Sequence, residues 1–142
     1  MREGAQPRVA RVAARSFLQL GGDREAAEII VASLEREWDS ELVDLYGECS
    51  LPDPTRQLEQ AERWLGVHSQ DATLLRVLGT LCQRQQLWGK AQTYLEASLA
   101  LDNNWRTQLA LGEMLGRLGR EDEANTHFVA ALKLATDELR RR

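Results

Sequence analysis

The chain has 142 residues, of which 43% are hydrophobic, and its formal net charge at pH 7 is -4. This length and composition allow one domain with a continuous apolar core. The negative charge argues against nucleic acid as the main partner. No stretch approaches the roughly 18 to 20 consecutive apolar residues of a membrane-spanning helix. We therefore expect a single domain over residues 1–142 that folds as a soluble unit.

The first predicted unit is a pair of helices over about residues 8–38, joined by a turn at Gly21-Gly22. Its second helix carries Ala26, Ile30, Ser33 and Leu34 at the spacing of one helix face, which predicts that they pack inward. The N-terminus lacks the apolar region of a signal peptide. Because the unit begins without a polar capping helix, the pattern favours an excised part of a longer protein over a complete cytosolic one.

The second predicted unit covers about residues 40–70. Leu45-Tyr46-Gly47 marks its first helix, and Leu51-Pro52-Asp53-Pro54 forms a strong break because proline cannot continue a helix. We expect the second helix from about Thr55 to Val67. Its inward side chains are expected to be Ala61, Trp64 and Leu65.

The third and fourth predicted units, about residues 72–103 and 105–139, repeat the same side-chain pattern 33 positions apart. The repeated set is Leu78-Gly79, Ala91, Leu95, Ser98 and Leu99 in one unit, and Leu111-Gly112, Ala124, Phe128, Ala131 and Leu132 in the other. The small residue at Gly79 or Gly112 lets paired helices approach, so a large residue there should overpack the unit. We expect Leu95 and Phe128 to fill the space between one unit and the next.

Helix start signals agree with this division. Residues of the types preferred at N-caps occupy the expected helix starts, namely Asp23, Ser40, Asp71 and Asn104. Arg84 is expected on an exposed face where replacement changes little. Leu-Gly followed by Ala-x-x-x-Phe, at a spacing in the low thirties, resembles the tetratricopeptide repeat (TPR). The sequence therefore predicts an all-α fold without strands, a right-handed superhelix of about four TPR-like helical hairpins.

Three segments also resemble the C-terminal TPR region of bacterial HemY proteins. They are Leu42-Val43-x-Leu45-Tyr46-Gly47, Leu74-Leu75-Arg76-x-Leu78-Gly79 and, most specifically, Leu87-Trp88-Gly89-Lys90-Ala91-x-x-Tyr94-Leu95. The resemblance implies an inner-membrane protein associated with late protohaem synthesis, whose two N-terminal spanning helices are absent from this chain. It implies that this part is soluble, faces the cytoplasmic side and has protein partners such as haem-synthesis enzymes.

The repeat pattern by itself predicts only a protein-interaction scaffold, since any TPR array shares these offsets. A generic cytosolic TPR adaptor for unrelated protein partners is therefore the alternative function. The two interpretations differ in partner and location, and both predict binding without catalysis.

The sequence shows no pattern typical of catalysis or metal binding. His68 and His127 have no carboxylate or cysteine at ligand spacing, so no zinc site is expected. We find no nucleophile and base pair, phosphate loop or carboxylate dyad, and therefore expect no enzyme. Haem or porphyrin is a candidate ligand through the HemY resemblance, but no axial ligand is identified. We expect His68 to be a solvated turn residue, His127 an exposed residue, and Cys49 and Cys82 free buried thiols.

The candidate binding surface is the concave side, which the first helices of such hairpins line. Helical periodicity places these charged side chains there: Arg8, Arg11, Arg15, Glu41, Asp44, Glu48, Arg76 and Arg106. Two interpretations are open. The arginines and carboxylates can pair with each other across repeat boundaries as ordinary solvated surface. Alternatively, the arginines can hold carboxylates of a partner protein or the propionates of a porphyrin by bidentate hydrogen bonds.

Overall fold

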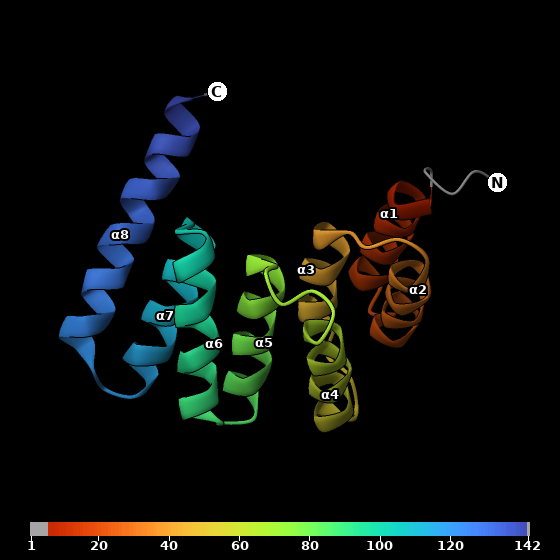
Figure 1. The fold of residues 1–142 in the computed structure, drawn as a ribbon, viewed down its shortest axis with the longest axis horizontal. Helices are drawn as coiled ribbons and strands as arrows, with labels where there is room; N and C mark the ends of the chain where they lie inside the picture. Colours follow the sequence, from red (N-terminus) through yellow and green to blue (C-terminus); the bar gives the residue numbers. More distant parts are fainter. Residues whose placement is uncertain (1–5, 142) are drawn as a thin grey trace.

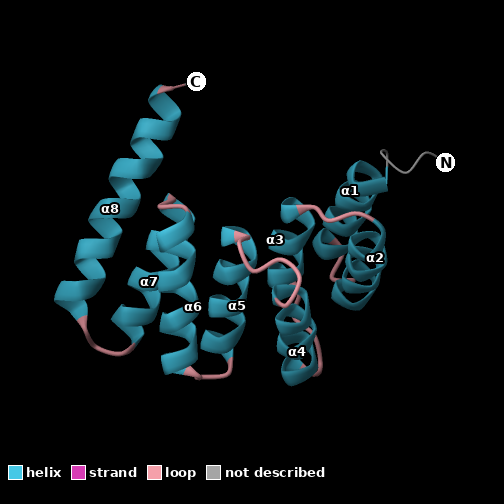
Figure 2. Ribbon diagram, in the orientation of Figure 1, coloured by secondary structure: helices cyan, strands magenta, loops and turns pink. Residues whose placement is uncertain are grey.

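The computed structural model describes residues 6–141 and contains eight α-helices and no strand in that range (Figure 1; Figure 2). The helices are α1 (Gln6–Gln19), α2 (Asp23–Arg36), α3 (Ser40–Glu48), α4 (Pro54–Leu65), α5 (Ala72–Arg84), α6 (Trp88–Leu101), α7 (Trp105–Arg117) and α8 (Glu121–Arg140). The predicted all-α fold is confirmed. None of the described helices combines the length and apolar character needed to cross a membrane.

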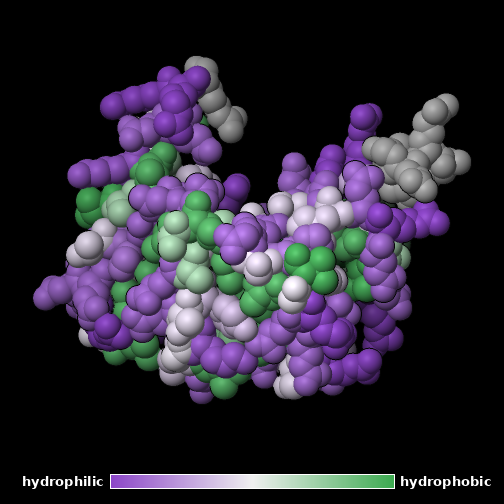
Figure 3. Space-filling model, viewed as in Figure 1, coloured by the Kyte–Doolittle hydropathy of each residue, from purple (hydrophilic) through white to green (hydrophobic). Residues whose placement is uncertain are grey.

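The helices follow one another along the long axis of the molecule, with α1 and α8 at opposite ends (Figure 1). α1 packs on α2, α5 on α6 and α7 on α8. Between the first two pairs, α3 contacts α1, α2 and α5, and α4 packs on α5. α7 in turn contacts α5 and α6. One continuous core results, with members from all eight helices. Hydrophilic side chains cover most of the face shown in Figure 3, with hydrophobic patches scattered between them.

Gly79 and Gly112 are points of close helix packing in the third and fourth units. A Cβ added at Gly79 would lie 2.6 Å from Leu95 Cδ2, and one at Gly112 would lie 2.6 Å from Phe128 Cε1. Leu95 and Phe128 therefore lie over the glycine of their own unit. The missing Cβ of each glycine makes the room that the large side chain occupies, a contact within the unit that the sequence analysis did not predict.

The second predicted hairpin departs from this geometry. α3 has only 9 residues, and α4 packs more closely on α5 than on α3. A Cβ added at Gly47 would lie 3.1 Å from Val77 of α5, so this glycine serves a contact between units. Gln57 of α4 is buried, and its Nε2 donates to the carbonyl oxygens of Tyr46 (3.1 Å) and Cys49 (3.0 Å). These hydrogen bonds connect α4 to the end of α3.

Two of the four predicted N-caps are confirmed. Asp71 and Asn104 precede α5 and α7, and each side chain accepts a hydrogen bond from the backbone N–H three residues later (3.1 Å and 2.9 Å). The other two predictions miss by one residue. Asp39 caps α3, because Ser40 is already its first helical residue. Asp23 is likewise the first residue of α2 and lies too late for the cap position.

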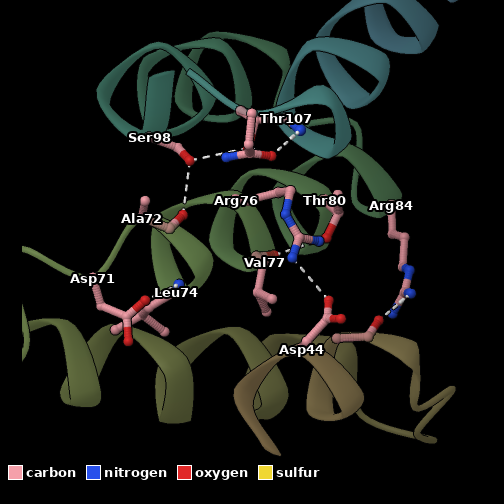
Figure 4. Close-up of polar contacts among 12 residues, drawn as sticks. Asp44, Asp71, Ala72, Leu74, Arg76, Val77, Thr80, Arg84, Ser98 and Thr107 are labelled. Carbon is pink, nitrogen blue, oxygen red and sulfur yellow. Dashed lines mark hydrogen bonds and ion pairs between the residues drawn. The ribbon is translucent and has the colours of Figure 1, made fainter. Parts of the chain in front are cut away.

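Arg84 has contacts that the sequence did not predict. Its Nη1 donates to the Cys49 carbonyl oxygen at 3.2 Å, and its Nη2 donates to the Gly47 carbonyl oxygen (Figure 4). The last carbonyl groups of a helix have no partner inside the helix. Arg84 is exposed, as predicted. Its guanidinium nevertheless satisfies carbonyl groups at the end of α3 and connects α5 to α3.

Candidate functional site

One groove crosses the stack on the side of the first helices. It has a volume of about 690 Å³ and is lined from α1, α3, α5 and α7. Its lining residues are Arg15, Glu41, Asp44, Leu45, Glu48, Arg76, Thr80, Trp105, Arg106, Leu109, Ala110 and Glu113. We call this surface the first-helix groove. Six of the predicted site residues lie together in it, namely Arg15, Glu41, Asp44, Glu48, Arg76 and Arg106.

Arg8 and Arg11, the other two predicted site residues, do not line the first-helix groove. Arg8 is exposed on α1. Arg11 forms an ion pair with Asp39, and its Nε lies 3.6 Å from Glu41 Oε2. Because Asp39 is the N-cap of α3, Arg11 joins the first unit to the second. Of the three arginines predicted for the first helix, only Arg15 therefore lines the groove.

Two of the three arginines in the groove, Arg15 and Arg76, are paired with carboxylates of a neighbouring first helix. Arg76 Nη2 of α5 donates to Asp44 Oδ1 of α3 at 2.9 Å (Figure 4), and the Arg76 side chain is only 14% exposed. Arg15 Nη2 of α1 lies 3.7 Å from Glu41 Oε2 of α3. A carboxylate of a partner would compete with these internal partners. Arg76 consequently helps to hold α5 against α3, whereas the exposed pair of Arg15 and Glu41 contributes little.

Three charged groups of the groove have no ion-pair partner within residues 6–141: Glu48, Arg106 and Glu113. The guanidinium of Arg106 lies over the ring of Trp105, 4.7 Å from its centroid, in a cation–π contact. Trp105 was not predicted as a site residue. It lies four positions before Leu109, so the same helical spacing could have found it. The groove thus combines available charges of both signs with an aromatic surface.

His68 does not behave as the solvated turn residue that we expected. Its ring stacks on Trp38 with the centroids 3.7 Å apart and the planes 9° from parallel, and the side chain is half-buried. Trp38 Nε1 donates to Asp71 Oδ2 at 2.8 Å. The cavity beside them has a volume of about 600 Å³. Its lining is largely of polar loop residues, among them Ser69 and Asp102, which does not fit the apolar faces of a porphyrin.

The remaining candidate ligands are occupied by internal contacts. His127 is half-buried where an exposed residue was expected, and its Nδ1 lies 2.7 Å from Gln108 Oε1. Cys49 and Cys82 are free and buried, as predicted. Burial raises the pKa of the Cys82 thiol to about 11 and that of Cys49 to about 12. Both are therefore protonated thiols at neutral pH. No group of three or more metal-ligating side chains occurs in the described part of the chain.

Comparison with known proteins gives a likeness of fold. A crystal structure of the TPR protein MamA superimposes with a TM-score of 0.67 at 16% sequence identity, covering 92% of this chain and 79% of that chain. A MamA RS-1 ArsTM double mutant gives a TM-score of 0.49 at 16% identity, covering 96% and 98%. No protein-family model and no curated protein matches the sequence. The first likeness confirms the predicted fold of TPR-like helical repeats.

Proposed function

We propose that the chain is a non-enzymatic TPR scaffold that holds a segment of a partner protein in the first-helix groove. The observation that carries the proposal is that four successive first helices contribute to one groove with available charges of both signs. Arg106 suits an acidic side chain of the partner, and Glu48 and Glu113 suit basic ones. The pair of Arg76 with Asp44 holds α5 against α3 before a partner binds.

The proposed partners are enzymes of late protohaem synthesis at the bacterial inner membrane. This part of the proposal rests on the resemblance to HemY proteins, which also places the membrane anchor in N-terminal helices outside this chain. The most specific segment of that resemblance opens α6. There Lys90 Nζ and Tyr94 Oη donate to Glu62 Oε2 of α4 at 2.8 Å and 2.7 Å. The segment therefore connects the second and third units and shapes the scaffold rather than the groove.

The test measures binding of purified late haem-synthesis enzymes to the chain by biolayer interferometry. Arg106→Glu reverses an available charge in the groove, whereas Arg117→Glu makes the same change on an exposed part of α7 outside it. We expect Arg106→Glu to weaken binding about tenfold, since close charge pairs contribute on the order of 1 kcal/mol each and reversal adds repulsion. Arg117→Glu should leave binding nearly unchanged.

Two results contradict different parts of the proposal. Equal effects of the two substitutions, or no effect of either on a bound enzyme, would show that the first-helix groove is ordinary solvated surface. If no haem-synthesis enzyme binds, a photocrosslinker placed at Leu109 in the groove distinguishes the remaining cases. Crosslinks to a single unrelated protein that Arg106→Glu removes and Arg117→Glu retains favour the generic adaptor.

A further inference from the structure

A second groove lies between α2 and α4, on the second helices. Its volume is about 580 Å³. α2 packs on α1 and α3, whereas α4 packs mainly on α5, so the two helices form separate walls. Its lining residues are Arg24, Ala27, Glu28, Val31, Ala32, Glu35, Tyr46, Leu51, Pro52, Asp53, Arg56, Gln57, Gln60 and Arg63. We call this surface the α2–α4 groove; it is independent of the first-helix groove.

The floor of the α2–α4 groove is largely apolar. Ala27 and Val31 come from α2, Tyr46 from α3, and Leu51 from the loop that follows it. Tyr46 is buried, and burial raises its pKa to about 12. The lining positions on α2 and α4 recur at helical spacings of three, four and seven. Two helix faces with an apolar floor form the kind of groove that receives the side chains of a third helix.

The two walls carry opposite charges at matched intervals. On α2, Glu28 and Glu35 are exposed and seven residues apart; on α4, Arg56 and Arg63 are also exposed and seven residues apart. Seven residues of a helix span about 10 Å, which is two turns. No ion pair joins the two walls in the part of the chain that the structure describes. Arg24 on the α2 wall and Asp53, the N-cap of α4, also line the groove. A mainly acidic edge therefore faces a mainly basic edge across an apolar floor.

We propose that the α2–α4 groove is a docking site for an amphipathic helix of a partner protein. That helix inserts an apolar stripe between the walls. Lys or Arg side chains at a seven-residue spacing on one of its edges face Glu28 and Glu35. Asp or Glu side chains at the same spacing on its other edge face Arg56 and Arg63. The spacing on both walls favours a helix. An extended segment covers about 10 Å in three residues, and side chains three positions apart on a strand point to opposite faces.

The experiment uses three synthetic helical peptides with the same leucine stripe and different edges: one Lys edge and one Glu edge, two Lys edges, or two Glu edges. Affinities are measured by fluorescence anisotropy. We expect the mixed-edge peptide to bind about tenfold more tightly than either of the others, since each of them brings like charges against one wall. Arg106→Glu in the first-helix groove should not change this order.

Variants of each wall make the test specific. Glu28→Lys with Glu35→Lys makes both walls basic, and the two-Glu-edge peptide should then bind most tightly. Arg56→Glu with Arg63→Glu makes both walls acidic, and the two-Lys-edge peptide should then bind most tightly. Glu37→Lys with Glu59→Lys lies outside the groove and changes the net charge by the same amount as the Glu28→Lys, Glu35→Lys variant. The mixed-edge peptide should still bind this control most tightly.

The proposal is overturned if all three peptides bind the unaltered chain equally or not at all. It is also overturned if the control pair changes the order of the peptides as much as the wall variants do. Circular dichroism checks that each variant is folded. Because the acidic wall and the basic wall are altered in separate variants, failure of one to fold leaves the other as a complete test.

Discussion

Ser98 Oγ lies 3.2 Å from Thr107 Oγ1 and donates to the Ala72 carbonyl oxygen at 2.7 Å (Figure 4). This hydroxyl therefore connects α6 to the helices on both sides. Ser33 occupies the corresponding position of the first unit, but the residue nine positions later is Leu42 instead of threonine. Ser33 Oγ is buried and has no hydrogen-bond partner among the described residues. The same side chain thus has opposite energetic roles in two units.

Replacement of each serine by alanine should show this difference. We expect Ser98→Ala to lower the free energy of unfolding by about 1 to 2 kcal/mol, because it removes buried hydrogen bonds. Ser33→Ala should be neutral or raise it by up to about 1 kcal/mol, because an unpaired buried hydroxyl is lost. Urea unfolding followed by circular dichroism measures both. Equal destabilisation by the two substitutions would contradict the assigned hydrogen bonding.

A methyl group at Gly79 should be costly. The added Cβ would lie 2.6 Å from Leu95, and we expect Gly79→Ala to destabilise the chain by about 1 to 3 kcal/mol through overpacking. Gly89→Ala is the matched control in α6, because nothing lies within 4 Å of a Cβ there. Its higher helix propensity should stabilise the chain by up to about 1 kcal/mol. Similar melting temperatures for the two variants would be inconsistent with this packing.

Arg84 provides a test of the link between α3 and α5. Arg84→Leu should lower the free energy of unfolding by about 1 kcal/mol, because two carbonyl groups at the end of α3 lose a charged donor. The control is Arg117→Leu at the corresponding position of α7, where the structure shows no side-chain hydrogen bond of the arginine within the described residues. Thermal unfolding of both variants checks the expectation. No difference between them would mean that the Arg84 hydrogen bonds contribute nothing measurable.

Periodicity predicted the helices and six of the twelve residues that line the first-helix groove, because both depend on spacing within one helix. Glu41, Asp44 and Glu48 share a face of α3 through their positions alone. Trp105 follows from the same helical spacing, but the sequence analysis predicted only its neighbour Arg106 as a site residue.

Contacts between units could not be predicted in this way. The Pro-Asp-Pro break changes how α4 lies against α3, so the pairing of Gly47 with Val77 has no counterpart in the regular repeats. The stacking of His68 on Trp38 joins residues 30 positions apart in two different loops. Such contacts depend on the angle between units, which repeat spacing does not determine.

The buried thiols should make the fold sensitive to alkaline pH. Burial raises the pKa of Cys82 from 9.0 to about 11 and that of Cys49 to about 12. Above pH 9 the unfolded chain loses thiol protons that the folded chain keeps, so stability falls as the pH rises toward 11. Cys82→Ala should make this decline shallower. Urea midpoints between pH 7 and pH 10.5 measure it, and an unchanged slope would show that Cys82 does not contribute.

Haemin binding provides the last prediction. The ring of His68 is stacked on Trp38, His127 is bound to Gln108, and Cys82 is a buried, protonated thiol. We therefore expect the isolated chain to bind haemin weakly, without a sharp Soret shift that one substitution abolishes. Spectroscopic titration of the unaltered chain, His68→Ala and Cys82→Ser makes the comparison, with His127→Ala as a control at the α7–α8 contact. A tight one-to-one complex that is lost in a single variant would identify that side chain as an axial ligand. The proposed scaffold would then also carry haem.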